Sequence, residues 1–309
     1  MAKNDKPLSR KEFLKTSAAG ILGICFSSVG VKDSNSANQK KNEVKPDLVE
    51  LGKTGIKVTP LGFGASRTME QSLVVAALEA GLNFLDTGRS YFRGQNEIMI
   101  GGAISGFRKE VVIQSKLDLG LTGQQLDSPA EIKKAVAEME ASLEASLRAL
   151  QTDYLDIMLI HGAVSPEVIF QEEIIRFFEE ARRKGMIRAH GFSCHTNQVE
   201  LLRAANEKLF YDVVMLPYNH QGAYVHANSG RRGKWDQVAL EEEMDKARQN
   251  GLGLVAMKTC SGGPLAAGPG TEPSYEEALK WVLRRGKVHT MAVAMANYSQ
   301  LREDLRALQ

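Results

Sequence analysis

The stretch GLNFLDTGRSYFRGQNE, Gly81 to Glu97, contains both the repeating pattern of this chain and a polar cluster that the pattern leaves unexplained. Its first glycine follows a helical pattern, and a short apolar run of strand length comes directly after it. Asp86 and Tyr91 then stand five residues apart, just past the end of that run. A carboxylate and a phenol in this position suggest a functional site at the end of a buried strand.

Seven further runs of strand length share the continuous apolar character that is typical of strands covered on both faces. They are VTPLGFGA (58–65), VVIQSK (111–116), DIMLIHG (156–162), IRAHGFSC (187–194), DVVMLPYN (212–219), LGLVAMKT (252–259) and HTMAVAMA (289–296).

Helical patterns separate these runs, and both of their ends are marked. Ser128-Pro129-Ala130-Glu131 forms a capping box at one helix start, and Ser274 with Glu277 forms another. Glycine tolerates the left-handed conformation that often ends a helix. A glycine stands between a helix and the next strand at Gly81, Gly185, Gly251 and Gly286.

Roughly eight strands alternating with about eight helices predict a closed parallel (β/α)8 barrel of the TIM type, an α/β fold. An open doubly wound sheet is the alternative, but no strand is followed by the G-x-G-x-x-G pattern of that fold. The stretch LVELGKTGIK, residues 48–57, predicts an N-terminal β-hairpin at the bottom of the barrel. Residues 47–309 are therefore interpreted as one barrel domain.

The composition narrows the classes of partner. The formal net charge of +2 on 309 residues gives no electrostatic reason to expect a nucleic acid or an anionic membrane as partner. Three cysteines make no disulfide framework. The composition indicates no oligomeric state.

The first 37 residues have the order of a signal peptide: charge, a small apolar core, and a polar exit. The segment SRKEFLK, residues 9–15, resembles the twin-arginine export motif, with Arg10-Lys11 in place of the arginine pair. This resemblance implies a partner, the twin-arginine export machinery, and a periplasmic or otherwise exported protein that acquires its cofactor before export. Residues 38–46 are then a linker. If the segment is only a polar tail, the expected location is the cytoplasm.

Polar residues end several of the predicted strands. Asp86, Lys116 and His161 terminate three consecutive strands, and active sites of such barrels lie at the carboxyl ends of the strands. Taken singly, each side chain has an ordinary structural role, such as a turn acceptor or a solvated strand end. Their joint placement predicts one site, over which the next loop brings Tyr91.

Four motifs, in this order, resemble those of the aldo-keto reductase family, from about residue 48 to residue 308. LVELGKTGIKVTPLGFGAS is similar to the family's opening, LDTGRSYFRGQNE to its Asp-Thr-Ala-x-x-Tyr-Gly-x-x-Glu, and TDYLDIMLIHG to its Asp-Tyr-x-Asp-x-x-x-x-His, while VVIQSK carries its lysine. The resemblance implies a reductase of aldehydes or ketones with a catalytic tetrad of Asp86, Tyr91, Lys116 and His161.

The chemistry is consistent with these residue types. Hydride transfer to a carbonyl leaves negative charge on oxygen, which an acid must meet with a proton. We expect Tyr91 to be that acid, with Lys116 lowering the pKa of the phenol from its ordinary value of about 10. Asp86 would orient Lys116, and His161 would donate a hydrogen bond to the substrate oxygen.

The hydride has to come from a cofactor, because no side chain carries one. The resemblance implies NADPH, with NADH as the alternative, bound over the barrel rim. Two positions depart from the family pattern, Cys194 where asparagine is usual and Met215 where glutamine is common. The residues that the resemblance assigns to the cofactor are Ser193, Met215, Lys258, Met295, Asn297 and Arg302.

Two other functions stay open at the level of sequence. His161, His195 and His220 fall at the ends of three successive strands, as metal ligands do in barrel hydrolases. A barrel that binds a nicotinamide cofactor without turnover, as a sensor or partner subunit, is the non-enzymatic alternative.

Overall fold

The computed structural model describes residues 46–225 and 230–309. The predicted export signal, residues 1–37, lies outside the described residues. Within the described part of the chain, no helix has both the length and the apolar character needed to cross a membrane.

In this part of the chain, eight parallel strands close into a barrel in the order β11-β12-β3-β4-β5-β6-β7-β8, with β8 paired to β11. This confirms the predicted (β/α)8 fold. The bounds of the strands are Leu61–Gly64 (β3), Phe84–Asp86 (β4), Val112–Asp118 (β5), Leu155–Ala163 (β6), Ile187–Cys194 (β7), Val213–Pro217 (β8), Gly253–Met257 (β11) and Thr290–Ala294 (β12).

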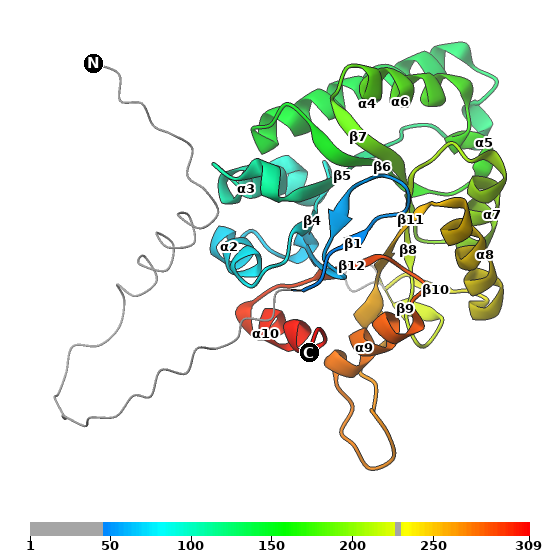
Figure 1. Ribbon diagram of the computed structural model, residues 1–309. Helices are drawn as coiled ribbons and strands as arrows, with labels where there is room; N and C mark the ends of the chain where they lie inside the picture. Colours follow the sequence, from blue (N-terminus) through cyan, green and yellow to red (C-terminus); the bar gives the residue numbers. More distant parts are fainter. Residues whose placement is uncertain (1–45, 226–229) are drawn as a thin grey trace, which may run out of the picture.

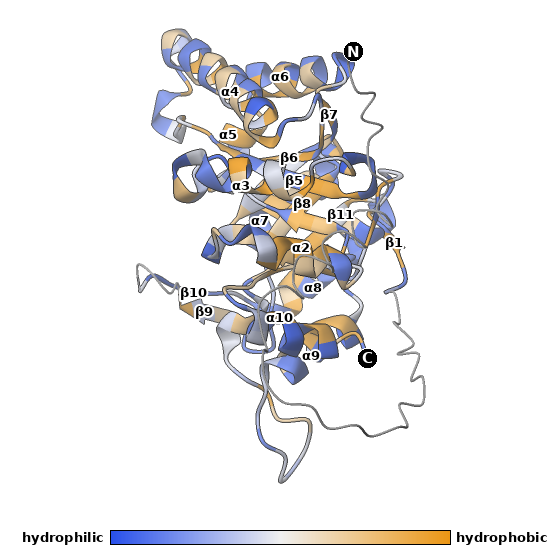
Figure 2. Ribbon diagram, turned by 90° about the vertical axis from the view of Figure 1, so that its left-hand side faces the viewer, coloured by the Kyte–Doolittle hydropathy of each residue, from blue (hydrophilic) through white to orange (hydrophobic). Residues whose placement is uncertain are grey.

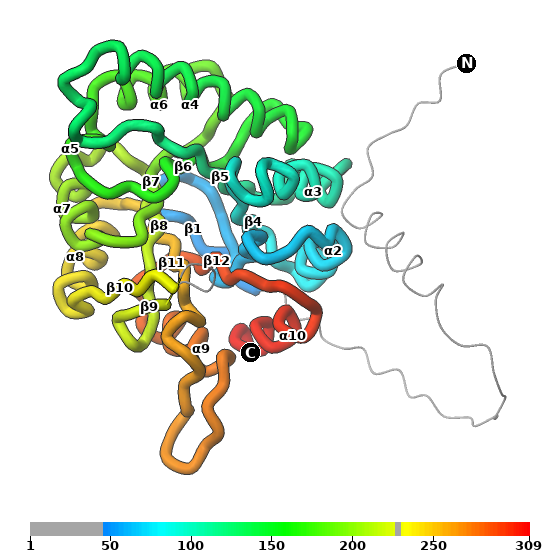
Figure 3. The backbone as a smooth tube through the Cα atoms, turned by 180° about the vertical axis from the view of Figure 1, so that it is seen from behind, coloured from blue at the N-terminus to red at the C-terminus, as the bar shows by residue number. Residues whose placement is uncertain are grey.

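Helices surround the barrel strands, as Figures 1 and 3 show from opposite sides. The α-helices are Gln71–Glu79 (α2), Gln95–Ala103 (α3), Pro129–Leu150 (α4), Pro166–Ile169 (α5), Glu172–Arg183 (α6), Gln198–Lys208 (α7), Gln237–Asn250 (α8), Tyr275–Arg285 (α9) and Tyr298–Arg306 (α10). Short 3-10 helices are Ala65–Arg67 (η1), Tyr91–Gly94 (η2), Arg108–Glu110 (η3), Gly123–Gln125 (η4) and Thr259–Gly262 (η5). The small hairpin of Ala223–Val225 (β9) and Arg232–Lys234 (β10) follows β8.

The predicted helix ends are present. Ser128 accepts a hydrogen bond from the backbone N–H of Glu131, and Ser274 accepts one from Glu277. Gly251 ends α8 at a φ of 84°, and its carbonyl accepts a hydrogen bond from Lys53 at 2.8 Å. The cap of α8 therefore also anchors the N-terminal hairpin.

The apolar residues form two layers, one inside the barrel and one between the strands and the helices. Figure 2 shows the hydrophobic strands in the middle and hydrophilic residues along the outer helices. Close packing of neighbouring strands requires a residue without a side chain at Gly191, where a Cβ atom would lie 1.7 Å from the carbonyl oxygen of Val213. The apolar cluster inside the barrel means that the interior is filled by side chains rather than open.

The N-terminal hairpin closes the bottom of the barrel, as predicted. Val49–Glu50 (β1) pairs antiparallel with Lys57–Val58 (β2). Leu51, Ile56 and Val58 are buried and belong to the cluster that fills the barrel interior. Their burial seals the end of the barrel opposite the carboxyl ends of the strands.

The run predicted as one strand over 58–65 is divided in the structure. Val58 belongs to β2, and the barrel strand begins at Leu61. Pro60 has no N–H to donate to a strand ladder. The N–H of Thr59 is instead bound by the side-chain oxygen of Asn83 at 2.8 Å. The chain therefore turns from the hairpin into the barrel at Thr59 and Pro60.

A buried histidine lies among aromatic rings outside the barrel. The ring of His190 stacks on Phe178 at 5.0 Å and lies 4.6 Å from Phe210. His190 is 1% exposed, and its Nδ1 has no hydrogen-bond partner among the described residues. Burial, helped by the charge of Arg182, lowers the pKa of His190 from 6.5 to about 3.

We expect this burial to destabilise the fold in acid. The unfolded chain binds a proton at His190 near pH 6.5, whereas the folded chain does so only near pH 3, so the free energy of unfolding falls as the pH drops below about 6.5. Between pH 7 and pH 5, His190 should lower the free energy of unfolding by about 2 kcal/mol. His190→Phe should remove about that much of the pH dependence in urea unfolding. An unchanged pH dependence would contradict the assignment.

Candidate active site

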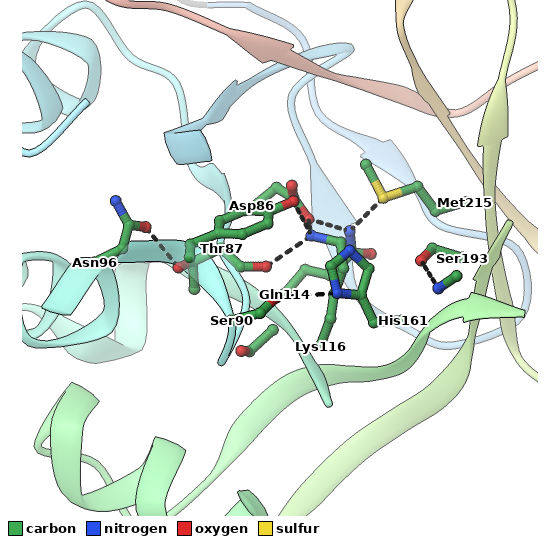
Figure 4. A network of polar contacts seen from close by, with 12 residues as sticks. Asp86, Thr87, Ser90, Asn96, Gln114, Lys116, His161, Ser193 and Met215 are labelled. Carbon is green, nitrogen blue, oxygen red and sulfur yellow. Dashed lines mark hydrogen bonds and ion pairs between the residues drawn. The ribbon is translucent and has the colours of Figure 1, made fainter. Parts of the chain in front are cut away.

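The four residues predicted to meet at the barrel mouth do meet there. Asp86 ends β4, Lys116 lies near the end of β5, and His161 lies near the end of β6. Tyr91 comes over them from η2, the loop after β4. Asp86, Tyr91 and His161 line a cavity of about 790 Å³. Figure 4 shows the polar network at this mouth.

Lys116 is the centre of the network. Its Nζ atom lies 2.6 Å from Oδ1 of Asp86, 2.7 Å from the carbonyl oxygen of Thr87 and 3.2 Å from the hydroxyl of Tyr91. An ammonium has three hydrogens to donate and no acceptor. All three are therefore directed at oxygen atoms. The hydrogen of the Tyr91 hydroxyl is left for another acceptor.

Asp86 also receives a hydrogen bond from a residue on the neighbouring strand. The amide nitrogen of Gln114 donates to Oδ1 of Asp86 at 2.6 Å and lies 3.4 Å from the sulfur of Met215. Gln114 is fully buried, and its Oε1 has no hydrogen-bond partner among the described residues. Gln114 thus supports the carboxylate from below, inside the barrel.

The loop that carries Tyr91 has an unusual backbone. Phe92 and Arg93 take the left-handed conformation, with φ of 48° and 56°, and Gly94 follows at 85°. Non-glycine residues held in this region cost free energy and persist only where neighbouring contacts fix them. The hydroxyl of Thr87 donates to Asn96 at 2.7 Å, and Arg89 forms an ion pair with buried Glu97.

Glu97 is itself fixed to the strand that carries the lysine. Its Oε1 accepts a hydrogen bond from Ser115 at 2.6 Å, and the backbone N–H of Arg89 donates to the carbonyl of Lys116 at 2.9 Å. The strained loop is therefore attached to β5 at two points, through Arg89 and through Glu97. These contacts hold Tyr91 within reach of Lys116.

The electrostatics of the pair differ in one respect from the sequence expectation. Burial raises the pKa of Tyr91, and the opposing effect of Lys116 does not reverse it. Burial alone would lower the pKa of Lys116, but Asp86 and Tyr91 outweigh it and raise that pKa. Lys116 therefore stays charged and Tyr91 stays protonated at neutral pH. The expected lowering of the Tyr91 pKa is not found in this pocket, because desolvation of the phenolate is the larger effect.

His161 faces Tyr91 across the mouth. The two ring centroids lie 5.9 Å apart in an edge contact, and the ring of His195 lies 6.1 Å from His161 on the other side. Nδ1 of His161 lies 2.9 Å from Oδ1 of Asp118 and 3.2 Å from the hydroxyl of Ser90.

The residues that the family resemblance assigned to a cofactor fall into two groups. Met215 and Lys258 line the cavity, and Lys258 lies 4.4 Å above the ring of Tyr224. The other four do not line it. Among these, the hydroxyl of Ser193 bridges to β6, accepting from Gly162 at 3.1 Å and donating to the carbonyl of Ile160 at 3.3 Å.

The remaining three lie at or near α10. Met295 is fully buried. Asn297 caps α10 by accepting a hydrogen bond from the N–H of Gln300. Arg302 is exposed on that helix. The structure therefore brings two of the six residues to the cavity.

Sequence reasoning missed several residues of the site. Arg67 adds an arginine to the cavity wall, which also contains the predicted Lys258, and Arg67 stands directly after the LGFGAS of the opening motif, outside the motifs recognised in the sequence. Gln114 and Asp118 stand two residues to either side of Lys116 in β5. Alternate residues of a strand face the same side. Polar residues two positions before and after Lys116 in an apolar run were therefore the signal that could have identified Gln114 and Asp118.

Burial and charge distinguish two ends of the cavity. At the η5 end, burial and the charge of Arg231 lower the pKa of Lys258 to about 8. At the α10 end the lining includes Gln300, Glu303 and Asp304, and burial raises the pKa of Asp304 to about 7.

The three histidines of the metal-hydrolase alternative do not form a ligand set. His161 and His195 are neighbours, but His220 packs against Trp281, with ring centroids 6.3 Å apart. Across residues 46–225 and 230–309, no group of three His, Cys, Asp or Glu side chains is arranged to hold a metal ion.

Comparison with known proteins gives consistent matches. Residues 60–277 match the model of the aldo/keto reductase family. The chain is 26% identical over 289 residues to "Uncharacterized oxidoreductase YqkF" of Bacillus subtilis (strain 168), a match that covers 87% of this chain and 90% of that protein.

Solved structures share the fold. Aldo-keto reductase AKR11C1 from Bacillus halodurans (holo form) has a TM-score of 0.66 at 23% identity, over 85% of this chain and 91% of that one. An aldo-keto reductase from Klebsiella pneumoniae in complex with NADPH has a TM-score of 0.62 at 22% identity, over 86% and 90% of the two chains.

The ion pair at the centre of the network should be costly to break from one side. Lys116→Met leaves the Asp86 carboxylate buried without its cation, so the free energy of unfolding should fall by about 3–5 kcal/mol in urea denaturation followed by circular dichroism. The double variant Asp86→Asn, Lys116→Met removes both charges and should recover part of that loss. A single variant as stable as the wild type would contradict this account.

Proposed function

The chain belongs to the aldo/keto reductase family, and on that basis we propose that it reduces the carbonyl group of an aldehyde or ketone to an alcohol with a nicotinamide cofactor. The observation that carries the proposal is the contact set of Lys116. Its three donated hydrogen bonds leave the proton of the Tyr91 hydroxyl available at the cavity.

Tyr91 is the proposed proton donor. Its high pKa keeps it protonated at neutral pH, which is the state that a reduction requires. As charge moves onto the substrate oxygen, Tyr91 gives up its proton, and the ammonium of Lys116 stabilises the phenolate that remains. The proton is transferred at Oη, and Lys116 keeps all of its own.

Asp86 and Gln114 act on Lys116 rather than on the substrate. Asp86 holds the ammonium charged and oriented, and Gln114 holds Asp86. His161 lines the same cavity and is the proposed hydrogen-bond donor to the substrate oxygen. His161 and Tyr91 therefore polarise the carbonyl, and Lys116 stabilises the charge that passes to the phenol.

The cavity suits a dinucleotide. Its volume of about 790 Å³ lies in the range of ligand pockets. Lys258 and Arg67 offer cations for phosphate groups, and Met215 and Met257 offer apolar surface for a nicotinamide ring. When bound, the cofactor supplies the hydride.

NADPH is the proposed cofactor, with NADH as the alternative. The Klebsiella pneumoniae relative is described as a complex with NADPH. Among the described residues of this chain, the arginine and lysine side chains that line the cavity and could contact a phosphate are Arg67 and Lys258. The two cofactors are distinguished directly by titration of the purified protein.

Replacement of the proton donor gives a sharp test. Tyr91→Phe should lower kcat for aldehyde and ketone reduction by about 10²–10⁴-fold. Binding of the cofactor, measured by fluorescence titration with NADPH and with NADH, should persist. Tyr275→Phe is the matched control, because Tyr275 lines the same cavity from the start of α9, whereas it is Tyr91 that accepts a hydrogen bond from Lys116.

Two outcomes of this test would count against the proposal. Full reductase activity in Tyr91→Phe would exclude the tyrosine as donor. If carbonyls never oxidise the bound cofactor of the wild type, the chain is a cofactor-binding sensor or partner subunit instead.

We also propose that the protein is exported through the twin-arginine machinery. The support is the sequence order of residues 1–37, in which Arg10-Lys11 precedes Phe13 and Leu14 and then a small-residue apolar run. Export of a folded protein agrees with a cofactor that is bound in a cavity assembled from several strand ends.

Replacing Arg10 and Lys11 by glutamine should retain the protein in the cytoplasm of a bacterium that has the twin-arginine pathway. Cell fractionation with an immunoblot measures this, and the unprocessed length should accumulate. Replacing Lys40 and Lys41, which follow the apolar run, serves as a control with the same loss of charge. Unchanged export of the Arg10-Lys11 variant would refute the signal hypothesis.

A further inference from the structure

A carboxylate that the proposed mechanism does not use faces the back of His161. Asp118 and Lys116 lie two residues apart on β5, and the Asp118 carboxylate lies 2.9 Å from Nδ1 of His161. The hydroxyl of Ser90 lies 3.2 Å from the same nitrogen. The hydrogen bond from His161, together with one from Ser90, holds the pKa of Asp118 below its usual range although partial burial opposes this.

This contact determines where the imidazole carries hydrogen. An ionised carboxylate only accepts hydrogen bonds, so Nδ1 must be the donor. A neutral imidazole carries one hydrogen, and if that hydrogen is on Nδ1 then Nε2 is a bare acceptor. In that form His161 has nothing to donate to a carbonyl oxygen from Nε2.

We propose that Asp118 is a positioning residue that keeps a proton on Nδ1 of His161, so that His161 polarises the substrate carbonyl from Nε2 only as an imidazolium. The proposal rests on the carbonyl reductase function proposed above. In this proposal, two ion pairs at the barrel mouth have separate roles. Asp86 with Lys116 serves the proton donor, and Asp118 with His161 serves the hydrogen-bond donor to the oxygen.

The protons balance without a relay. Tyr91 transfers one proton to the substrate oxygen, and His161 keeps both of its ring protons throughout the step. The imidazolium lowers the energy of the developing negative charge through a charge-assisted hydrogen bond. Asp118 remains a carboxylate and touches neither substrate nor cofactor.

The surroundings of His161 contain charges of both signs. Asp118 and Lys116 come from β5, Tyr91 comes from η2, and His195 follows β7. The ammonium of Lys116 is held by Asp86 at 2.6 Å. The side chain of His161 is 19% exposed and that of Asp118 is 62% exposed. Asp118 is therefore the carboxylate that contacts His161 directly, in a partly solvated place where its effect is moderate.

The test is the pH dependence of kcat/KM. Asp118→Asn removes the charge and keeps the shape, so the alkaline limb of the profile should move about one pH unit toward acid. The variant should be near wild type at pH 6 and about tenfold slower at pH 8.5. Asp118→Glu should restore much of the loss. Asp153→Asn, at the opposite end of β6 from His161, is the control and should match the wild type.

Each other result overturns the proposal. An equal loss at pH 6 and pH 8.5 means that Asp118 has a merely structural role. No loss, or a gain at pH 8.5, means that the neutral imidazole donates from Nε2.

A second measurement needs neither substrate nor turnover. In protein labelled with ¹⁵N at histidine, nitrogen chemical shifts report which ring nitrogen of His161 is protonated. At alkaline pH the wild type should keep its hydrogen on Nδ1, and Asp118→Asn should lose that preference. A bare Nδ1 in the wild type overturns the proposal. If the wild type reduces no carbonyl, only the proposed function fails, and this spectrum still decides the role of Asp118.

Discussion

The buried contact between the Asp86 carboxylate and the Lys116 ammonium is the constraint on which the barrel mouth depends. Oδ1 of Asp86 and Nζ of Lys116 lie 2.6 Å apart, and the side chains are 4% exposed for Asp86 and 1% for Lys116. Neither charge is tolerable there alone, since a charge removed from water needs a partner and further hydrogen bonds. Thr87 and Tyr91 accept the other two hydrogens of the ammonium. One cation therefore fixes the ends of β4 and β5 and the phenol above them.

The loop after β4, which carries the phenol, contains strained backbone. Directly after Tyr91 the chain turns through Phe92 and Arg93, which both lie in the left-handed region. The ion pair of Arg89 with Glu97 and the hydrogen bond of Thr87 with Asn96 hold the turn in place. Strained backbone therefore lies next to the phenol that contacts the buried ammonium, and these contacts keep it in place.

The same placement explains the protonation of the site. Desolvation keeps the phenol protonated even though a cation touches it, and the cation stays charged because Asp86 faces it. In such a pocket, the protonated phenol of Tyr91 can donate its proton to an oxygen atom on which negative charge develops. His161 with Asp118 adds a second polar pair at the rim, where solvent weakens it. Burial thus separates a strong inner pair from a weaker outer one.

The sequence by itself determined the (β/α)8 architecture, the bottom hairpin, the capped helices and the four residues of the mouth. These are local signals: apolar runs of strand length, Ser128 and Ser274 before helices, and polar residues at strand ends that a parallel barrel must bring to one rim. Only the tertiary structure decided what each polar group touches. Gln114 under Asp86, Asp118 behind His161, Arg67 in the cavity wall and Ser193 turned toward β6 all depend on distances between different strands. The raised pKa of Tyr91 likewise depends on burial, which is set by the packing of the whole mouth and by no single segment of the chain.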